Sequence, residues 1–153
     1  MITSGQTAPD FTLPRDGGGS VTLSALRPGT VVLYFYPKDD TPGCTLEAQD
    51  FNARLADFTA AGCTVIGISK DSVKAHDKFC KKHGLSIVLA SDEAGTTCED
   101  YGVWLEKSMY GKTYMGIERT TVLIDGTGQV AQVWNKVSVK GHAEAVLAAV
   151  RAL

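Results

Sequence analysis

The sequence has 153 residues, a length that suits one domain with a single hydrophobic core. Hydrophobic residues make up 44% and charged residues 21%, and the formal net charge of −2 gives no basic excess for a nucleic-acid or anionic-membrane partner. No apolar run approaches a membrane span, and the N-terminal residues lack the basic and apolar regions of a secretory signal. We therefore expect one cytoplasmic domain over residues 1–153.

The residue pattern predicts alternating strands and helices. Uninterrupted β-branched and aromatic residues predict buried strands, and apolar residues at intervals of three and four predict helices. Gly17 to Gly19 predict a turn between two short extended pieces. In chain order the predicted elements are extended pieces at 11–14 and 20–23, a strand at 30–36, a helix from 42 that ends before Gly62, a strand at 63–69, a helix at 73–83, a strand at 85–91, a short helix or turn at 95–101, an irregular segment at 103–118, a strand hairpin at 120–135 and a closing helix at 141–153.

This order predicts an α/β domain with a mixed central β-sheet flanked by helices and an N-terminal β-hairpin extension. The four cysteines form no Cys-x-x-Cys pair, which counts against a structural zinc site and a thioredoxin-type redox motif. In a chain without a recognisable leader they are more typical of thiols in a reducing compartment than of structural disulfides. The histidines show no metal-ligand spacing, so we expect no metal and no cofactor. All three, namely His76, His83 and His142, are expected to be solvated or partly packed.

One cysteine, Cys44 in "PKDDTPGCTLEAQDF", is predicted to lie in the first turn of a helix. Thr41 is a good N-cap residue, and Pro42 fits the first helical position, which does not need its N–H. Unpaired amides and the helix dipole stabilise a thiolate there, and Gly43 allows a close approach to the backbone. The placement favours an ionised, accessible sulfur. The alternative is a half-buried cysteine that packs as a small hydrophobic residue.

The segment "FYPKDDTPGCTLEAQDF" resembles the active site of peroxiredoxins of the bacterioferritin-comigratory or Q-type subgroup. The family pattern of proline, threonine and cysteine stands here as Pro37, Thr41 and Cys44, and Arg119 in "GIERTTVLID" matches the distant arginine. The segments "APDFTLPRDGG" and "GVWLEKSMYGKTYMGIERTTVLIDGTGQV" extend the resemblance over nearly the whole chain. It implies a thioredoxin-like fold and thiol-dependent reduction of hydrogen peroxide and organic hydroperoxides, with Cys44 as the peroxidatic residue.

Ionisation of a thiol cannot by itself make an efficient peroxidase. Lowering a thiol pKa from about 8.5 to about 6 increases the thiolate about 30-fold at pH 7, from roughly 3% to 90%. The accompanying loss of nucleophilicity takes back roughly 13-fold, which leaves a gain of about two- to threefold. The remaining rate must come from positioning the peroxide and stabilising its lengthening O–O bond. We assign this role to the Thr41 hydroxyl, the amides near Gly43 and Cys44, and the Arg119 guanidinium.

Two further residues are assigned supporting roles. Pro37 is expected to shield the sulfur from water. Glu47, one turn beyond Cys44, is expected to orient Arg119 by a bidentate contact. Without the resemblance, Arg119 would be interpreted as a solvated arginine at the rim of the domain.

The sulfenic acid that forms on Cys44 must be recycled, and a second cysteine can resolve it. Many members of the subgroup carry it five residues on, where this chain has Gln49. Cys80, in the helix at 73–83, resembles the arrangement of another form of the subgroup and is the predicted resolving residue, helped by the neighbouring cations Lys81 and Lys82. Cys98, expected to be exposed, is the alternative resolving residue, and Cys63 is expected to lie in the core.

A disulfide requires Cα atoms about 4.4–6.8 Å apart, which two separate helices seldom satisfy. We therefore predict that the first turn of the Cys44 helix unwinds in each turnover. The oxidised protein would then be reduced by thioredoxin or a similar dithiol partner. Members of the subgroup are often monomers, so the resemblance also predicts a monomer. Two other interpretations stay open: a one-cysteine peroxidase that uses external thiols, and a redox-responsive binding protein.

Overall fold

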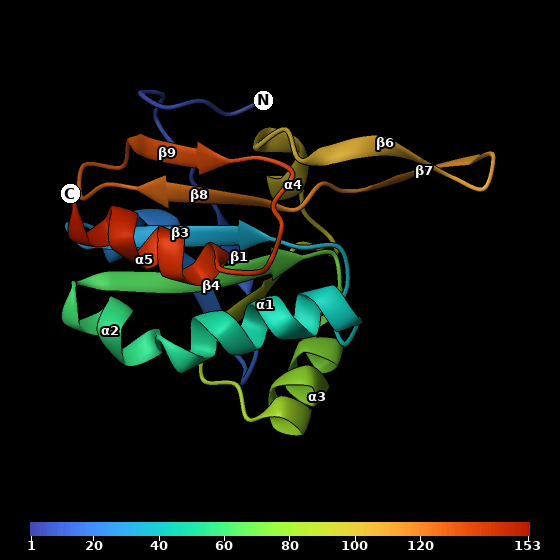
Figure 1. Cartoon of the computed structure of the whole chain (residues 1–153), viewed down its shortest axis with the longest axis horizontal. Coiled ribbons are helices and arrows are strands. Elements are labelled where there is room, and N and C mark those ends of the chain that lie inside the picture. Colours follow the sequence, from blue (N-terminus) through green and yellow to red (C-terminus); the bar gives the residue numbers. More distant parts are fainter.

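The computed structural model describes residues 1–153 and contains a five-stranded sheet in the order β5-β4-β3-β8-β9 (Figure 1). β3 and β5 are parallel to β4, whereas β8 is antiparallel to β3 and β9, so the predicted mixed sheet is confirmed. None of the helices combines the length and apolar character needed to span a bilayer. The elements are β1 (Thr12–Pro14), β2 (Ser20–Thr22), the 3₁₀ helix η1 (Leu23–Leu26), β3 (Thr30–Phe35), α1 (Pro42–Ala53), α2 (Leu55–Ala60), β4 (Cys63–Ser69), α3 (Val73–His83), β5 (Val88–Ser91), α4 (Thr97–Asp100), β6 (Trp104–Met109), β7 (Lys112–Ile117), β8 (Thr120–Ile124), β9 (Val130–Trp134) and α5 (His142–Arg151).

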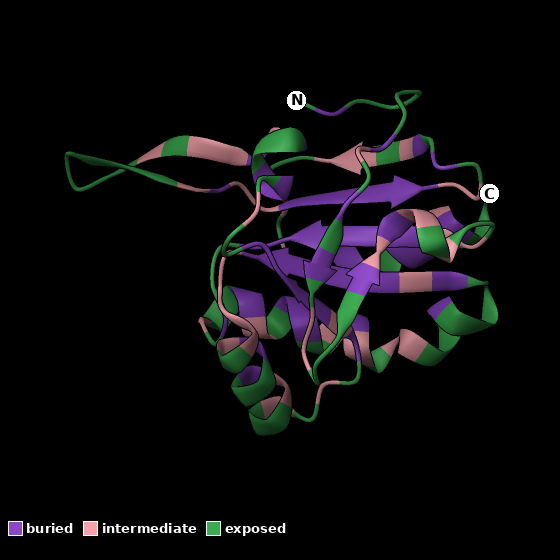
Figure 2. Cartoon of the chain, turned by 180° about the vertical axis from the view of Figure 1, so that it is seen from behind, coloured by how far each residue is buried: buried purple, intermediate pink, exposed green.

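The central strand β3 is buried on both faces, which explains its uninterrupted apolar sequence. Alternate side chains point to opposite faces of a strand. Val32 and Tyr34 pack in one hydrophobic cluster with residues of α1, α2, α3 and α5. Val31 and Leu33 pack in a second cluster with residues of the predicted N-terminal hairpin, β1–β2, and of the segment around α4. Seen from behind, β1 and β2 lie across this second face (Figure 2).

The predicted long helix after β3 is divided in two, and the prediction of one continuous helix is wrong. In a continuing α-helix the Arg54 N–H would bond to the Asp50 carbonyl. Here the Arg54 guanidinium donates to that carbonyl at 3.1 Å, and the Arg54 N–H bonds instead to the Phe51 carbonyl at 3.1 Å. The hydrogen-bond ladder therefore stops at Arg54, where α1 ends and α2 begins.

The segment predicted to be irregular, 103–118, forms a regular hairpin of β6 and β7 that projects from the body of the protein (Figure 1). Its two-residue turn is Tyr110-Gly111, and both residues have positive φ, 52° and 76°. Turns with two positive φ values match the twist of a hairpin. A tyrosine at the first of these positions is a weak turn signal, which is why the sequence pattern did not predict the hairpin.

Candidate active site

The candidate site begins where β3 ends and α1 starts. Thr41 has extended backbone angles (φ −95°, ψ 155°), Pro42 is the first helical residue, and the Thr45 N–H bonds to the Thr41 carbonyl at 2.8 Å. Thr41 therefore occupies the N-cap position, but its hydroxyl donates to the Lys38 carbonyl at 2.9 Å instead of capping the helix. The first-turn amides, including that of Cys44, keep no acceptor within the helix.

The structure brings Cys44 and Arg119 together, although 75 residues separate them. Arg119 lies between β7 and β8, and its Nη2 donates to the Cys44 Sγ at 3.3 Å. The expectation of an accessible sulfur is wrong for this conformation, because Cys44 is only 2% exposed. It packs in the same buried cluster as Ala48 and Phe51 of its own helix. In this conformation the sulfur is therefore almost completely shielded from solvent.

Glu47 holds the other side of the guanidinium. Arg119 Nη1 donates to Glu47 Oε1 at 2.7 Å, while the second oxygen, Oε2, is buried without a partner. The contact is thus made through one carboxylate oxygen and not the expected two. Burial raises the pKa of Glu47 to about 7, although the Arg119 charge acts in the opposite direction. The carboxylate that orients Arg119 therefore changes its charge near neutral pH.

Gly43 leaves room for the guanidinium. A Cβ atom at this position would lie 3.3 Å from Arg119 Nη2, closer than an ordinary van der Waals contact. The close approach expected at Gly43 is therefore made by Arg119. Pro37 is exposed in the loop after β3, and its shielding of the sulfur stays a prediction.

The predicted resolving residue, Cys80, lies in the last part of α3. The Ser72 hydroxyl caps this helix by accepting from the Ala75 N–H at 3.1 Å, and Gly84 ends it with a φ of 63°. Both boundaries agree with the sequence prediction. Cys80 is half-buried beneath the turn between β1 and β2, with its Sγ 3.9 Å from Asp16 Oδ2.

The expectation that nearby lysines favour a Cys80 thiolate is wrong. Burial first, and then the charge of Asp16, raise the pKa of Cys80 to about 12. Lys82 instead pairs with Asp40, with Nζ and Oδ2 2.8 Å apart. Carboxylates and not cations dominate the surroundings of this sulfur, so Cys80 is a protonated thiol in the folded protein.

The substitution Asp16→Asn should make the Cys80 thiol more reactive. The Asp16 Oδ1 accepts the Leu89 N–H at 2.9 Å, a bond that the asparagine oxygen can keep while the charge is lost. In a background with Cys44→Ser, we expect iodoacetamide to alkylate Cys80 at least about threefold faster at pH 8, because thiolate is the reactive form. Peptide mass spectrometry measures the rate, and the buried Cys63 and Cys98 serve as internal controls. An unchanged Cys80 rate would contradict the effect assigned to Asp16.

The other two cysteines are buried. Cys63 is 3% exposed, as expected for a core residue. Cys98 was expected to be exposed but is 0% exposed, because α4 turns it into the cluster on the second face of the sheet. The Asp92 Oδ2 accepts the Cys98 N–H at 2.8 Å, and burial raises the pKa of the Cys98 thiol. Complete burial on this face of the sheet does not suit a resolving residue, whereas Cys80 is only half-buried.

Three residues near the two cysteines were given no role in the site by the sequence analysis. Lys107 of β6 donates to the Ile117 carbonyl, and its pKa is lowered by burial and by the charge of Arg119. Asp39 and His76 form a buried pair at 2.6 Å, which contradicts the expectation that all histidines are solvated or partly packed. The position of His76 four residues before Cys80, on the same face of the helix, was the available signal.

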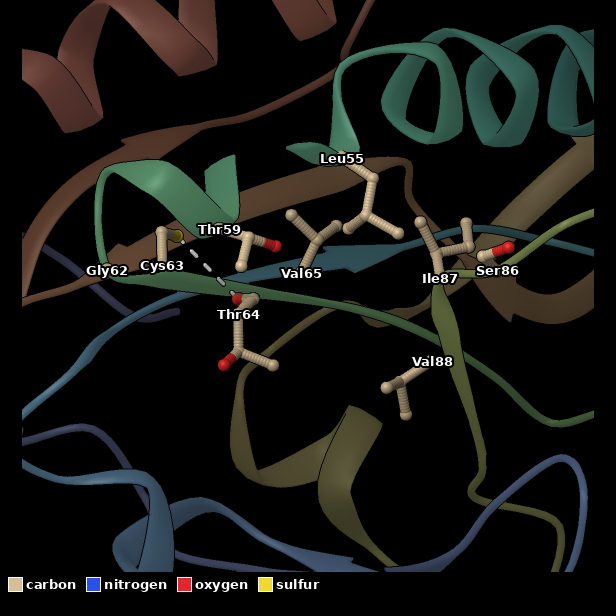
Figure 3. Close-up of a pocket in the computed structure, with 9 residues that line it drawn as sticks. All are labelled: Leu55, Thr59, Gly62, Cys63, Thr64, Val65, Ser86, Ile87 and Val88. Atoms are coloured by element: carbon tan, nitrogen blue, oxygen red, sulfur yellow. Dashed lines mark hydrogen bonds between the residues drawn. The ribbon is translucent and has the colours of Figure 1, made fainter. Parts of the chain in front are cut away.

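A hollow of about 320 Å³ lies elsewhere, between α2, β4 and residues 86–88 (Figure 3). Cys63 lies at its edge, where its thiol donates to the Thr64 carbonyl at 3.7 Å. The lining contains neither Cys44 nor Arg119. Its position therefore does not connect it with the candidate active site.

Comparisons with known proteins agree with this geometry. Residues 4–133 match the model of the AhpC/TSA family. A putative peroxiredoxin bcp of Coxiella burnetii is 53% identical over 146 residues, which cover 95% of this chain and 97% of the relative. Peroxiredoxin Bcp of Xanthomonas campestris pv. campestris is 52% identical, with 94% of this chain and 89% of the relative covered.

Solved structures show the same likeness. One structure of Xanthomonas campestris peroxiredoxin Q, called F4, matches with a TM-score of 0.90 at 49% identity, covering 99% of this chain and 96% of that one. A second structure of peroxiredoxin Q from this organism, called LUss, matches with a TM-score of 0.83 over the same shares. A thioredoxin-like sheet that presents a cysteine at a helix start beside an arginine defines a thiol-dependent peroxidase. The chain belongs to the AhpC/TSA family, and its relatives are peroxiredoxins of the Bcp or Q type.

The substitution Glu47→Gln should slow the reaction with hydrogen peroxide by about tenfold at pH 8, since a neutral amide holds the guanidinium less firmly than a carboxylate. At pH 5.5, below its pKa of about 7, Glu47 is itself protonated, so the difference should nearly vanish. The ratio of the two rate constants at each pH therefore follows the charge of Glu47. Stopped-flow measurement of the second-order rate constant from pH 5.5 to 8 checks this.

The matched control is Asp57→Asn, which removes an exposed carboxylate on α2. It should leave the rate constant unchanged throughout the range. A ratio between wild type and Glu47→Gln that does not vary with pH would show that the charge of Glu47 plays no part.

Proposed function

We propose that the Cys44 thiolate performs the peroxidase reaction on hydrogen peroxide and organic hydroperoxides. A sulfur lone pair forms the S–O bond, the O–O bond breaks, and the departing oxygen leaves with that bond's electron pair and takes up a proton. The products are a Cys44 sulfenic acid and water or an alcohol. The contact of 3.3 Å between Arg119 Nη2 and Cys44 Sγ carries this proposal, because it sets a cation beside both the thiolate and the oxygen that it attacks.

The remaining polar groups suit a bound hydroperoxide. The free first-turn amides and the guanidinium donate to the peroxide oxygens. The Thr41 hydroxyl was expected to be a donor, but its proton is directed to the Lys38 carbonyl. Its oxygen is therefore free to accept the peroxide O–H. A solved structure of the Xanthomonas campestris bacterioferritin comigratory protein is described as giving insights into its alkyl peroxide reduction activity, which supports organic hydroperoxides as substrates here.

The proposed second step joins Cys44 to Cys80. The Cys80 sulfur attacks the sulfenic sulfur, the S–O bond breaks with its electron pair going to oxygen, and the departing hydroxyl takes up the thiol proton and leaves as water. Both sulfurs lie within helices, and Cys44 is 2% exposed, so the first turn of α1 must unwind and part of α3 must open. The different TM-scores to two structures of peroxiredoxin Q from Xanthomonas campestris, 0.90 and 0.83, support a fold that adopts more than one conformation.

A dithiol protein such as thioredoxin would then reduce the disulfide, and its own two thiols would become a disulfide. We also propose that the protein acts as a monomer in the cytoplasm. Four cysteines without a Cys-x-x-Cys pair are more typical of thiols in a reducing compartment than of a structural disulfide framework.

Mass mapping of disulfides after one equivalent of hydrogen peroxide tests the assignment. The reduced protein is treated, alkylated at acid pH and digested, and we expect one linked peptide pair that contains Cys44 and Cys80. A disulfide between Cys44 and Cys98 would instead assign the resolving role to Cys98. A persistent Cys44 sulfenic acid would indicate a one-cysteine peroxidase.

A further inference from the structure

A buried set of hydrogen bonds joins the loop before Cys44 to the helix that carries Cys80. His76 is 0% exposed, and its Nδ1 lies 2.6 Å from Asp39 Oδ2. The other ring nitrogen, Nε2, lies 3.0 Å from the Ala90 carbonyl of β5. The Tyr36 hydroxyl donates to Asp39 Oδ1 at 2.5 Å, which fixes the carboxylate. Asp39 lies between Pro37 and Thr41, and His76 lies on the helix of Cys80. The hydrogen bonds therefore connect the peroxidatic segment with the helix of the proposed resolving residue.

The geometry determines where the proton lies. A backbone carbonyl can only accept, so Nε2 must carry a hydrogen. The Asp39 oxygen at 2.6 Å can accept a hydrogen bond only if a proton lies between it and Nδ1. Imidazole is the more basic of the two groups, so the proton belongs to the ring. These partners assign His76 as an imidazolium that donates from both nitrogens.

We propose that the His76 imidazolium holds the loop before Cys44 against α3, and that loss of its proton releases the two segments for the resolving step. This inference rests on the proposed role of Cys80. It makes His76 and Asp39 positioning residues, since neither touches the peroxide. The Cys80 thiol lies one helical turn beyond His76, so the release of His76 frees the turn that must move.

Other polar and charged groups face the ring from each neighbouring element. Asp71, between β4 and α3, accepts the Asp39 N–H at 2.9 Å and adds a second negative charge, and Tyr36 of the β3 end lies beside the ring. Burial lowers the pKa of His76, but the hydrogen bond and charge of Asp39 outweigh burial and raise it above its ordinary value. The closed form is therefore stabilised below the ordinary histidine pKa, and this stabilisation is lost as pH rises through the raised value.

The first measurement needs no substitution. In reduced protein, histidine ¹⁵N NMR should show both His76 nitrogens protonated at pH 6.5. Hydrogen exchange, corrected for intrinsic rates, should show the protection of α3 and of the Thr45 amide, whose bond to the Thr41 carbonyl closes the first turn of α1, falling about fivefold or more between pH 6.5 and pH 9. A neutral His76 ring at pH 6.5 would overturn the proposal, as would protection that does not change with pH. Neither result depends on which cysteine resolves the sulfenic acid.

The substitution Asp39→Asn should reverse the sign of this pH dependence. The asparagine amide can donate to an unprotonated Nδ1, and its oxygen can accept the Tyr36 hydroxyl, so the contact is made with a neutral ring. Protection should then be high at pH 9 and fall as pH drops and the ring gains a proton. A merely structural role for Asp39 would lower protection equally at every pH, and that result would overturn the proposal.

A kinetic experiment links the contact to the resolving step. The side chain in His76→Gln has only one donor group, so it cannot donate to both Asp39 and the Ala90 carbonyl as His76 does. Disulfide formation after one equivalent of peroxide should therefore be about tenfold faster at pH 6.5. The matched control is His83→Gln, because His83 lies on the same helix and binds Asp40 of the same loop at 2.9 Å in an exposed pair. Exposed pairs contribute little to stability, so the control should stay within twofold of wild type. Equal acceleration by both variants, or none by His76→Gln, would overturn the assignment to His76. Disulfide mapping of the same samples separately reports whether Cys80 is the partner.

Discussion

Replacing Arg119 by glutamine should lower the second-order rate constant for hydrogen peroxide by roughly 10²–10³-fold, the usual cost of losing one preorganised donor at developing charge. The guanidinium is the group that touches both the Cys44 sulfur, at 3.3 Å, and the Glu47 carboxylate, at 2.7 Å. Glutamine keeps a polar side chain but loses the positive charge. Stopped-flow mixing with excess peroxide, followed by mass spectrometry of the sulfenic acid, measures the rate constant directly.

Arg119→Lys separates charge from geometry. Lysine keeps the charge but cannot hold a sulfur and a carboxylate at once through a planar fork, so most of the loss should remain. Arg151→Gln is the matched control, because Arg151 is an exposed arginine paired only with Asp57. A loss of less than about threefold in the rate constant of Arg119→Gln would show that the guanidinium does not stabilise the transition state.

Replacing Cys80 by serine should abolish continuous turnover with a thioredoxin system while leaving the first turnover intact. Cys80 lies apart from the Arg119 contact, so the attack of Cys44 on peroxide should proceed within about twofold of the wild-type rate. Without a resolving thiol the product remains a sulfenic acid, which further peroxide can oxidise to sulfinic acid. A coupled NADPH assay measures turnover, and intact mass reports the oxidation state of Cys44.

Cys98→Ser is the control for this experiment, since Cys98 is a buried cysteine on the other face of the sheet. It should turn over like wild type. Full thioredoxin-coupled turnover in Cys80→Ser would exclude the proposed disulfide, and turnover restored by small external thiols would favour a one-cysteine peroxidase. A protein that consumes only one equivalent of peroxide under excess reductant would instead be a redox-responsive switch.

Much of the fold could be predicted because its elements obey local rules. The Ser72 cap and the Gly84 stop fixed both ends of α3, and an unbroken apolar run identified the central strand β3. The break between α1 and α2 could not be predicted, because it depends on the Arg54 side chain reaching a carbonyl four residues back. A side chain that competes for a backbone carbonyl does not alter the spacing of the apolar residues, so the pattern that predicted one helix gave no sign of the break.

The candidate site was likewise predictable only in part. The residues of the quoted motif could be placed near Arg119 by resemblance, and the structure does bring Cys44, Glu47 and Arg119 into contact. The burial of Cys44 and the carboxylate next to Cys80 could not be predicted. Both depend on chain segments distant in sequence: Asp16 reaches Cys80 across 64 residues. Neighbouring lysines in the sequence suggested the opposite charge.

The break at Arg54 limits how far the proposed unwinding can spread. Cooperative loss of helical structure travels along an unbroken ladder of backbone hydrogen bonds, and the ladder of α1 covers only residues Pro42–Ala53. Beyond it, α2 has its own hydrogen bonds and is anchored by Phe58, which is 0% exposed. The catalytic helix is thus a short cooperative unit, able to melt at its first turn while the hydrophobic packing over the sheet stays intact.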